Sequence, residues 1–204
     1  YPQADIHYED NMWNGMPTQN DRIPGIAKRI GELLGEAYQL EYGWDAVRIV
    51  RPSNVYGPYD DFNPNTAQVI PALIYRMVNG ENPVHVWGDG SAIRDFAFSR
   101  DVAEGIILAL HYGTRGDFVN LGSGTDTTIK ELLKKLNSFL DFNYSFDTSK
   151  SSGFPKRIMD ISRAREWINY NPTTSLLDGL KETWNWFQDN QDEYLKRKNY
   201  FAEE

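Results

Sequence analysis

The sequence contains no cysteine among its 204 residues. A disulfide framework, a thiolate nucleophile and a metal site with cysteine ligands are therefore excluded. The absence of cysteine is consistent with a reducing compartment, and we expect a cytoplasmic protein. The three histidines, His7, His85 and His111, are widely spaced and lack i, i+4 partners, so we expect no metal site.

Positive charge is also scarce, because 21 Lys and Arg residues stand against 29 Asp and Glu residues, for a net charge of −8 at pH 7. Such a surface repels the phosphates of nucleic acids and anionic lipids, so we expect neither as a main partner. No window approaches the roughly 18 consecutive apolar residues that a membrane helix needs. The first residues also lack the basic and apolar regions of an export signal.

Apolar residues are plentiful: 40% of the chain is hydrophobic, with 6 Trp, 12 Tyr and 10 Phe, enough for one sizeable core or two small ones. Apolar residues at helical spacing predict helices over residues 25–42, 66–79, 101–112, 128–140, 162–168 and 175–188. Short β-branched and aromatic runs predict strands over residues 46–50, 84–87, 94–98, 117–121 and 143–146. This order predicts an α/β fold with part of a parallel sheet and a smaller appended mixed α/β lobe.

One predicted strand leads directly into a polar loop, Ser53-Asn54-Val55-Tyr56-Gly57-Pro58. A strand that ends in such a loop is a common way to place binding residues on a rigid scaffold. Asn54 can hydrogen-bond a ligand there or cap its own turn, and both interpretations stay open.

Seven segments, taken in order, resemble the extended short-chain dehydrogenase/reductase family, also described as NAD-dependent epimerases/dehydratases of nucleotide sugars. The segments are Tyr1-Pro2, Gly25-Ile26-Ala27-Lys28, Arg51 to Pro58, Val86 to Gly90 with Arg94-Asp95-Phe96, Asp101-Val102-Ala103, Asn120 to Gly124, and Arg157 to Asp160. Within the family, the stretch from Asp61 to Leu73 is most similar to the GDP-fucose synthases.

The resemblance implies a Rossmann domain that binds NAD or NADP and a C-terminal lobe that binds a nucleotide diphosphate sugar. It assigns residues 1–60 to the Rossmann domain and residues 61–204 mainly to the lobe. The glycine-rich cofactor loop of the family follows its first strand, and this sequence has no such loop. We therefore expect that the chain corresponds to the C-terminal part of a family member and that cofactor binding by this chain alone is doubtful.

The resemblance also implies a catalytic dyad in which a Tyr precedes a Lys by four residues. Lys28 matches the Lys, but Pro24 stands in the place of the Tyr, and proline has no proton to exchange. Gln68 stands where GDP-fucose synthases carry an acid/base His, and an amide does not titrate near neutral pH. We therefore expect that the chain alone does not catalyse the reaction.

By position in the family motifs, Lys28, Pro52 and Ser53 are candidate cofactor contacts, with Lys28 also the candidate catalytic residue. The candidate substrate contacts are Asn54, Val69, Arg76, Trp87, Arg94 and Arg157. Arginine suits a diphosphate because its planar fork donates two parallel hydrogen bonds. Simpler roles remain open: Lys28 as a surface charge, the three arginines as surface ion pairs, and Trp87 as a buried strand residue.

The sequence leaves three functions open. The chain is the substrate-binding part of a nucleotide-sugar epimerase/reductase, or a catalytically lost relic that binds the sugar or pairs with a partner chain, or a protein of purely structural association. Family dimers pack through the helix that matches residues 25–42, and we expect a homodimer through that helix.

Overall fold

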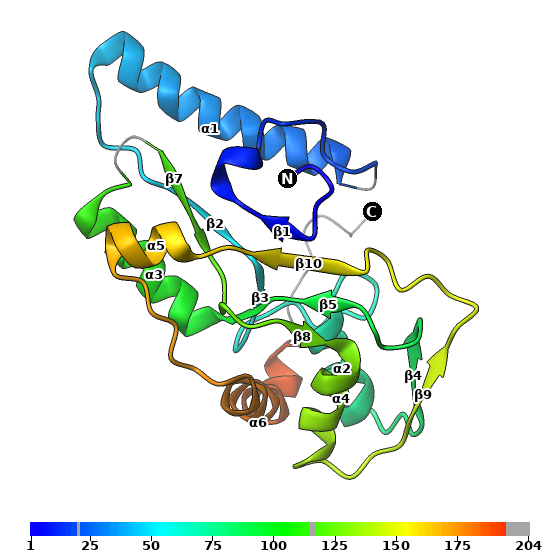
Figure 1. Ribbon diagram of the computed structural model, residues 1–204. Coiled ribbons are helices and arrows are strands. Elements are labelled where there is room, and N and C mark those ends of the chain that lie inside the picture. Colours follow the sequence, from blue (N-terminus) through cyan, green and yellow to red (C-terminus); the bar gives the residue numbers. More distant parts are fainter. Residues whose placement is uncertain (20, 115–116, 195–204) are drawn as a thin grey trace, which may run out of the picture.

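The computed structural model of the chain describes residues 1–19, 21–114 and 117–194 (Figure 1). The helices are η1 (Glu9–Asn11, a short 3-10 helix), α1 (Arg22–Tyr42), α2 (Val69–Val78), α3 (Ser99–Tyr112), α4 (Ile129–Asn137), α5 (Ser162–Ile168) and α6 (Leu176–Tyr194). The strands are β1 (Ile6–His7), β2 (Ile49–Pro52), β3 (Asn54–Tyr56), β4 (Val84–Trp87), β5 (Ile93–Arg94), β6 (Phe96–Phe98), β7 (Phe118–Leu121), β8 (Thr127–Thr128), β9 (Tyr144–Asp147) and β10 (Lys156–Met159).

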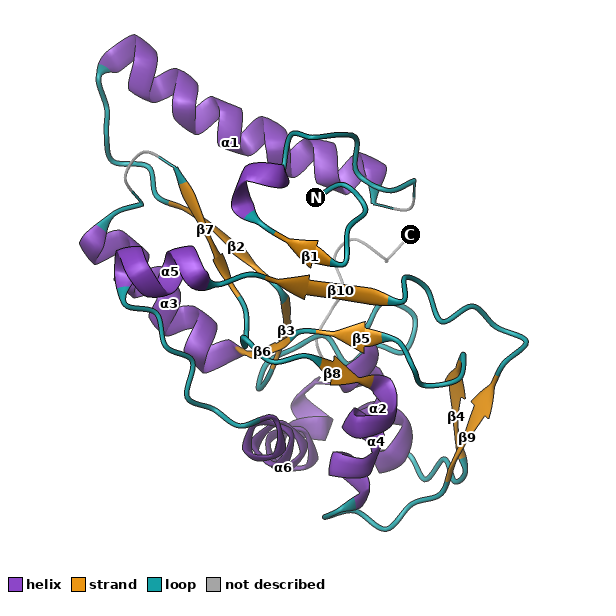
Figure 2. Cartoon of the chain, in the orientation of Figure 1, coloured by secondary structure: helices purple, strands orange, loops and turns teal. Residues whose placement is uncertain are grey.

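The strands form one four-stranded sheet and three pairs, as Figure 2 shows. The sheet has the order β1-β10-β5-β8, and the pairs are β2 with β7, β3 with β6 and β4 with β9. Within residues 1–19, 21–114 and 117–194, β5 and β8 pair in antiparallel orientation, and the other pairings are parallel. The expected α/β fold with a partly parallel sheet is therefore confirmed.

Helix α1 lies on one side of the β2–β7 pair, and α3 and α5 lie on the other side (Figure 1). The sequence predicts its start at Gly25, whereas α1 begins at Arg22. Pro24 does not prevent this earlier start, because a first-turn residue needs no backbone N–H donor. The predicted stop is confirmed, since Gly43 ends α1 in a left-handed conformation.

Several other predicted boundaries were wrong. Pro71 fits only in the first turn of a helix, so α2 begins at Val69 instead of Thr66. Asp101, predicted as the cap of α3, lies inside its first turn, and its buried carboxylate accepts hydrogen bonds from the backbone and hydroxyl of Thr174. The strand predicted at 94–98 divides at Asp95 into β5 and β6, because the chain passes there from one sheet to another strand pair.

Two hydrophobic clusters hold these elements together. The larger packs α2, α4 and α6 around Phe62, Ile74 and Leu133, none of which is exposed to solvent. The smaller packs α3 and α5 against β7 around Val119 and Ala164. The proposed domain boundary near residue 60 stays a prediction, and residues 195–204 of the predicted lobe lie outside the described residues.

No helix within the described ranges is long and apolar enough to cross a membrane.

Candidate functional site

Three cavities share lining residues and follow one another from α1 and β2 to α2 and β4. The first, of about 590 Å³, lies between α1 and β2. The second, of about 250 Å³, shares Pro52 with the first and continues to Asn54. The third, of about 530 Å³, shares Asn54 with the second and lies between α2, β4 and β5. The segment after β2, predicted as a loop, forms β3 from Asn54 on; its Ser53 borders the second cavity and its Asn54 borders the second and the third.

The third cavity unites most of the predicted substrate contacts. Its lining includes Asn54, Val69, Arg76, Trp87 and Arg94, which come from four different elements of the chain, β3, α2, β4 and β5. Trp87 is 68% exposed, so its role as a buried strand residue is excluded. An exposed indole at the rim of a cavity offers a flat apolar face for stacking.

Arg94 is half-buried at the edge of this cavity. Its NH1 donates hydrogen bonds to the carbonyl oxygens of Ile93 (2.8 Å) and Phe154 (2.7 Å). Its NH2 makes a longer contact of 3.3 Å with the carbonyl oxygen of Ser152. Burial lowers the pKa of Arg94, and the positive charge of Arg157 lowers it further. No carboxylate in the described part of the chain forms an ion pair with Arg94, so its charge is available to an anion.

Arg157 borders the second cavity instead of the third. It is in register with Arg94 on the neighbouring strand, so the two guanidinium groups originate on the same face of the sheet. Its NH2 lies 3.1 Å from Oδ2 of Asp21, which precedes α1. Hydrogen bonds from Thr18 and Arg157 lower the pKa of Asp21 and keep it ionised.

Arg76 lines the third cavity but makes an ion pair of its own. Its Nε donates to Glu81 at 2.6 Å, and its NH2 donates both to Glu81 and to the carbonyl oxygen of His85. The hydrogen bond from Arg76 lowers the pKa of Glu81. A diphosphate would compete with this carboxylate for Arg76, so Arg94 is the stronger candidate for phosphate binding.

The predicted cofactor contacts border the first two cavities. Lys28 is exposed on α1 and lines the first cavity together with Pro52. Ser53 lines the second cavity together with Asp95, which is only 1% exposed. Burial raises the pKa of Asp95, and hydrogen bonds from Ser123 and from the hydroxyl of Ser53 oppose this rise.

The candidate cofactor contacts fit the nicotinamide end of NAD or NADP and do not fit the rest of the cofactor. Lys28, Pro52 and Ser53 could hold its nicotinamide and ribose, but the described chain offers no glycine-rich turn for its pyrophosphate. Gly122-Ser123-Gly124 is not such a turn, because Ser123 hydrogen-bonds the buried carboxylate of Asp95 through its backbone and its hydroxyl.

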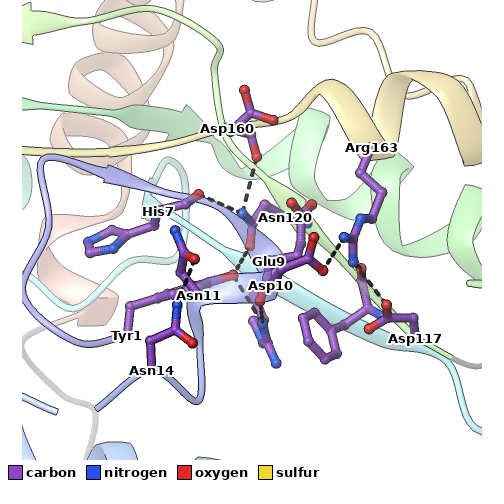
Figure 3. A network of polar contacts seen from close by, with 12 residues as sticks. Tyr1, His7, Glu9, Asp10, Asn11, Asn14, Asp117, Asn120, Asp160 and Arg163 are labelled. Atoms are coloured by element: carbon purple, nitrogen blue, oxygen red, sulfur yellow. Dashed lines mark hydrogen bonds and ion pairs between the residues drawn. The ribbon is translucent and has the colours of Figure 1, made fainter. Parts of the chain in front are cut away.

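The sequence did not single out His7 as a site residue, yet β1 places it beside the second cavity. Asn120 fixes β1 there, because its side-chain amide donates to the carbonyl oxygens of His7 (2.9 Å) and Asp160 (3.1 Å) and accepts from the hydroxyl of Tyr1 (Figure 3). The backbone N–H of Asn120 donates to the buried carboxylate of Glu9. The ring of His7 stacks on Tyr1, and burial, with the charge of Arg157, lowers its pKa to about 4.

Gln68 lines the third cavity near Asn54, where its amide can hydrogen-bond a ligand without exchanging a proton.

Asp21, Asp95 and His7 are the site residues that sequence reasoning missed. Asp95 carried a signal, since it lies inside the family-like segment Arg94-Asp95-Phe96, whereas β1 is too short for its two residues to show a pattern. In residues 1–19, 21–114 and 117–194, no three His, Asp or Glu side chains gather in a way that could hold a metal ion.

Comparison with known proteins places this site in a family. The model of the NAD dependent epimerase/dehydratase family matches residues 10–122. GDP-L-fucose synthase 1 of Arabidopsis thaliana is 37% identical over 171 residues, which cover 81% of this chain and 52% of the relative. GDP-L-fucose synthase of Escherichia coli K12 is 34% identical over 201 residues, which cover 91% of this chain and 62% of the relative.

Solved structures of related enzymes have a similar fold. A GDP-L-fucose synthetase from Naegleria fowleri superposes with a TM-score of 0.80 at 25% identity, covering 94% of this chain and 61% of that chain. UDP-glucose 4-epimerase from Thermotoga maritima, solved with UDP-glucose, superposes with a TM-score of 0.68 at 32% identity, covering 87% and 59%. The chain thus spans between half and two thirds of the length of these relatives. With more than half of its residues matched by the family model, the chain belongs to the NAD dependent epimerase/dehydratase family.

Proposed function

We propose that this chain is the nucleotide-sugar-binding part of an NAD(P)-dependent epimerase, dehydratase or reductase, and that its ligand is a GDP-sugar. The observation that carries the proposal is the third cavity, where the unpaired charge of Arg94 and the exposed ring of Trp87 lie with the amides of Asn54 and Gln68. These groups can bind a diphosphate, a flat base and sugar hydroxyls. Guanine is our choice of base because the plant and bacterial relatives above are named GDP-L-fucose synthase.

The cofactor in this proposal is NAD or NADP, held by Lys28, Pro52 and Ser53 at its nicotinamide end. When bound, the nicotinamide supplies hydride exchange with the sugar. The pyrophosphate would be held by residues outside these 204. One feature supports additional strands: β2 pairs only with β7 among the described strands, which leaves its other edge with free backbone N–H and C=O groups. The lack of cysteine favours the cytoplasm as the compartment.

Within this chain, the residues bind and orient the substrate but lack the expected proton donor. Pro24 occupies the first turn of α1, and Gln68 borders the cavity that would hold the sugar. Neither side chain exchanges a proton near neutral pH. These two residues favour a second candidate function, a nucleotide-sugar-binding protein without catalysis.

The expected homodimer also belongs to this proposal. Ile23, Ile30, Leu34 and Tyr38 are all more than half exposed and recur at intervals of four and seven residues on α1. Such spacing places them on one face of the helix, where a second copy of α1 can cover them.

The proposal is tested by titration calorimetry of the purified chain with a GDP-sugar, a UDP-sugar and the free sugar, beside an NADPH oxidation assay. We expect saturable binding of the GDP-sugar, weaker binding of the UDP-sugar and no turnover. Turnover by the chain alone would refute its binding-only role, and absence of binding by both nucleotide sugars would refute the proposed site.

A further inference from the structure

The segment Ser151–Phe154, between β9 and β10, forms one wall of the third cavity, which Ser151, Ser152 and Gly153 line. Ser152 packs closely against Gly88, so the segment rests on the turn that follows β4. Gly153 has a φ of 72°, in the left-handed region that favours glycine. The segment therefore has a definite backbone conformation beside the cavity.

The backbone of this segment holds Arg94. Both hydrogens of NH1 are used, one by the carbonyl oxygen of Ile93 and one by that of Phe154. The carbonyl oxygen of Ser152 takes one hydrogen of NH2. Among the described residues none accepts from Nε, and NH2 keeps a second hydrogen. Fixing NH1 fixes the guanidinium plane, so the edge formed by Nε and NH2 has a set direction.

The same segment also contacts Arg157, because the ring of Phe154 lies under that guanidinium, 4.8 Å from carbon to ring centre. Arg94 and Arg157 are in register on adjacent strands, and each positive charge disfavours the other. Carbonyl dipoles on one arginine and an aromatic face on the other offset this repulsion. The segment thus stabilises this pair of like charges together with Asp21, which forms an ion pair with Arg157.

We propose that Gly153 is a positioning residue for substrate binding: it lets the Ser152 and Phe154 carbonyl groups fix Arg94 so that Nε and NH2 face the diphosphate. The proposal rests on the proposed function. A Cβ atom at position 153 would lie 3.4 Å from NH2 of Arg94. A side chain there would contact NH2 of Arg94, and it would also strain the backbone, because φ is 72°.

Gly80 provides a matched control. It has a φ of 80°, but a Cβ atom there would meet nothing within 4 Å. Gly153→Ala and Gly80→Ala both place an alanine in the left-handed region, at φ of 72° and 80°, and only the first adds an atom beside Arg94. Because Gly153→Ala could fold poorly, Gly153→Asn is a second variant, since asparagine tolerates the left-handed region better than other residues with a side chain.

The experiment measures GDP-sugar affinity by calorimetry and, without ligand, the NMR relaxation of the Arg94 Nε–H group in the folded chain. We expect Gly153→Ala and Gly153→Asn to weaken binding about tenfold and to make Arg94 Nε–H more mobile, with Gly80→Ala unchanged in both. Wild-type affinity in both Gly153 variants, or equal losses at positions 80 and 153, would overturn the inference. If the wild type binds no nucleotide sugar, the proposed function fails, and an unchanged Nε–H signal in the Gly153 variants overturns the inference separately.

Discussion

Arg51 on β2 and Glu32 on α1 form a two-point ion pair that is almost closed to solvent. Nε of Arg51 lies 2.7 Å from one carboxylate oxygen of Glu32, and NH2 lies 2.6 Å from the other. The side chains are only 8% and 15% exposed. The guanidinium also lies 3.2 Å from the ring centre of Phe118. This pair fixes the helix that carries Lys28 against the strand that ends in Pro52.

Removing one partner of this pair should destabilise the protein, because the other charge stays buried without compensation. We expect Glu32→Gln to lower the free energy of unfolding by about 3 kcal/mol, measured by urea denaturation. The pair of Arg100 and Glu182 is the control, since its side chains are 69% and 40% exposed. Glu182→Gln should change stability by less than about 1 kcal/mol. Equal effects of the two variants would show that the buried pair does not fix α1.

Replacing Arg94 by lysine should weaken nucleotide-sugar binding, because an ammonium group cannot donate two parallel hydrogen bonds to a phosphate. We expect an affinity loss of about tenfold for Arg94→Lys and about a hundredfold for Arg94→Ala, measured by calorimetry. Arg100→Lys, at the exposed start of α3, should bind as the wild type does. Wild-type affinity in Arg94→Ala would remove Arg94 from the site.

The buried imidazole of His7 should make stability depend on acidity. Its folded pKa of about 4 lies below the usual histidine value of 6.5, so the unfolded chain binds the proton more readily. The stabilising contribution is complete above pH 6.5 and is lost as the pH falls from 6.5 to about 4. We expect this loss to be roughly 2 kcal/mol, less than the full shift implies, because the ring borders a cavity open to solvent.

Urea denaturation at pH 7 and pH 4.5 measures this effect. His7→Gln should lose less stability between the two pH values than the wild type. The exposed His111, replaced in the same way, is the control, and this variant should follow the wild type. A His7→Gln variant with an unaltered pH dependence would contradict the assignment.

A charge on the exposed face of α1 should break the proposed dimer. We expect Leu34→Glu to convert a wild-type dimer into a monomer in light scattering, since the apolar face then carries two like charges at the contact. Ile107→Glu is the matched control, because Ile107 is equally apolar and 66% exposed, but on α3. A wild-type monomer at micromolar concentration, or dissociation by Ile107→Glu alone, would contradict an α1 interface.

Long periodic segments of this fold could be predicted from the sequence, and short ones could not. Apolar spacing located α4, whose buried residues Ile129, Leu132, Leu133 and Leu136 recur every three or four positions, and it also located α1, whose periodic apolar residues are mostly exposed. The two residues of β1 and of β8 are too few for any period, and they are strands only because β10 and β5 pair with them. β10 was missed for a related reason, since Lys156 and Arg157 give it no apolar alternation.

The candidate site also contains some residues that the sequence reveals and others that only the structure reveals. Family motifs led to Asn54, Trp87 and Arg94, and the structure brings these residues to one cavity. His7 reaches the site only through the hydrogen bonds of Asn120, which lies 113 positions away along the chain. Such tertiary contacts leave no local pattern. Only the structure, likewise, separates Arg76, which is paired with Glu81, from Arg94.

The most direct test of the account is an NMR titration of the chain with a GDP-sugar that follows all six Trp indole N–H signals and the Arg Nε–H signals together. The account predicts saturable shifts of Trp87 and Arg94 with one common affinity, and small changes at Trp167 and Trp184, which do not line the third cavity. Saturable shifts at other tryptophans with Trp87 and Arg94 unmoved, or no saturable shift at all, would contradict it.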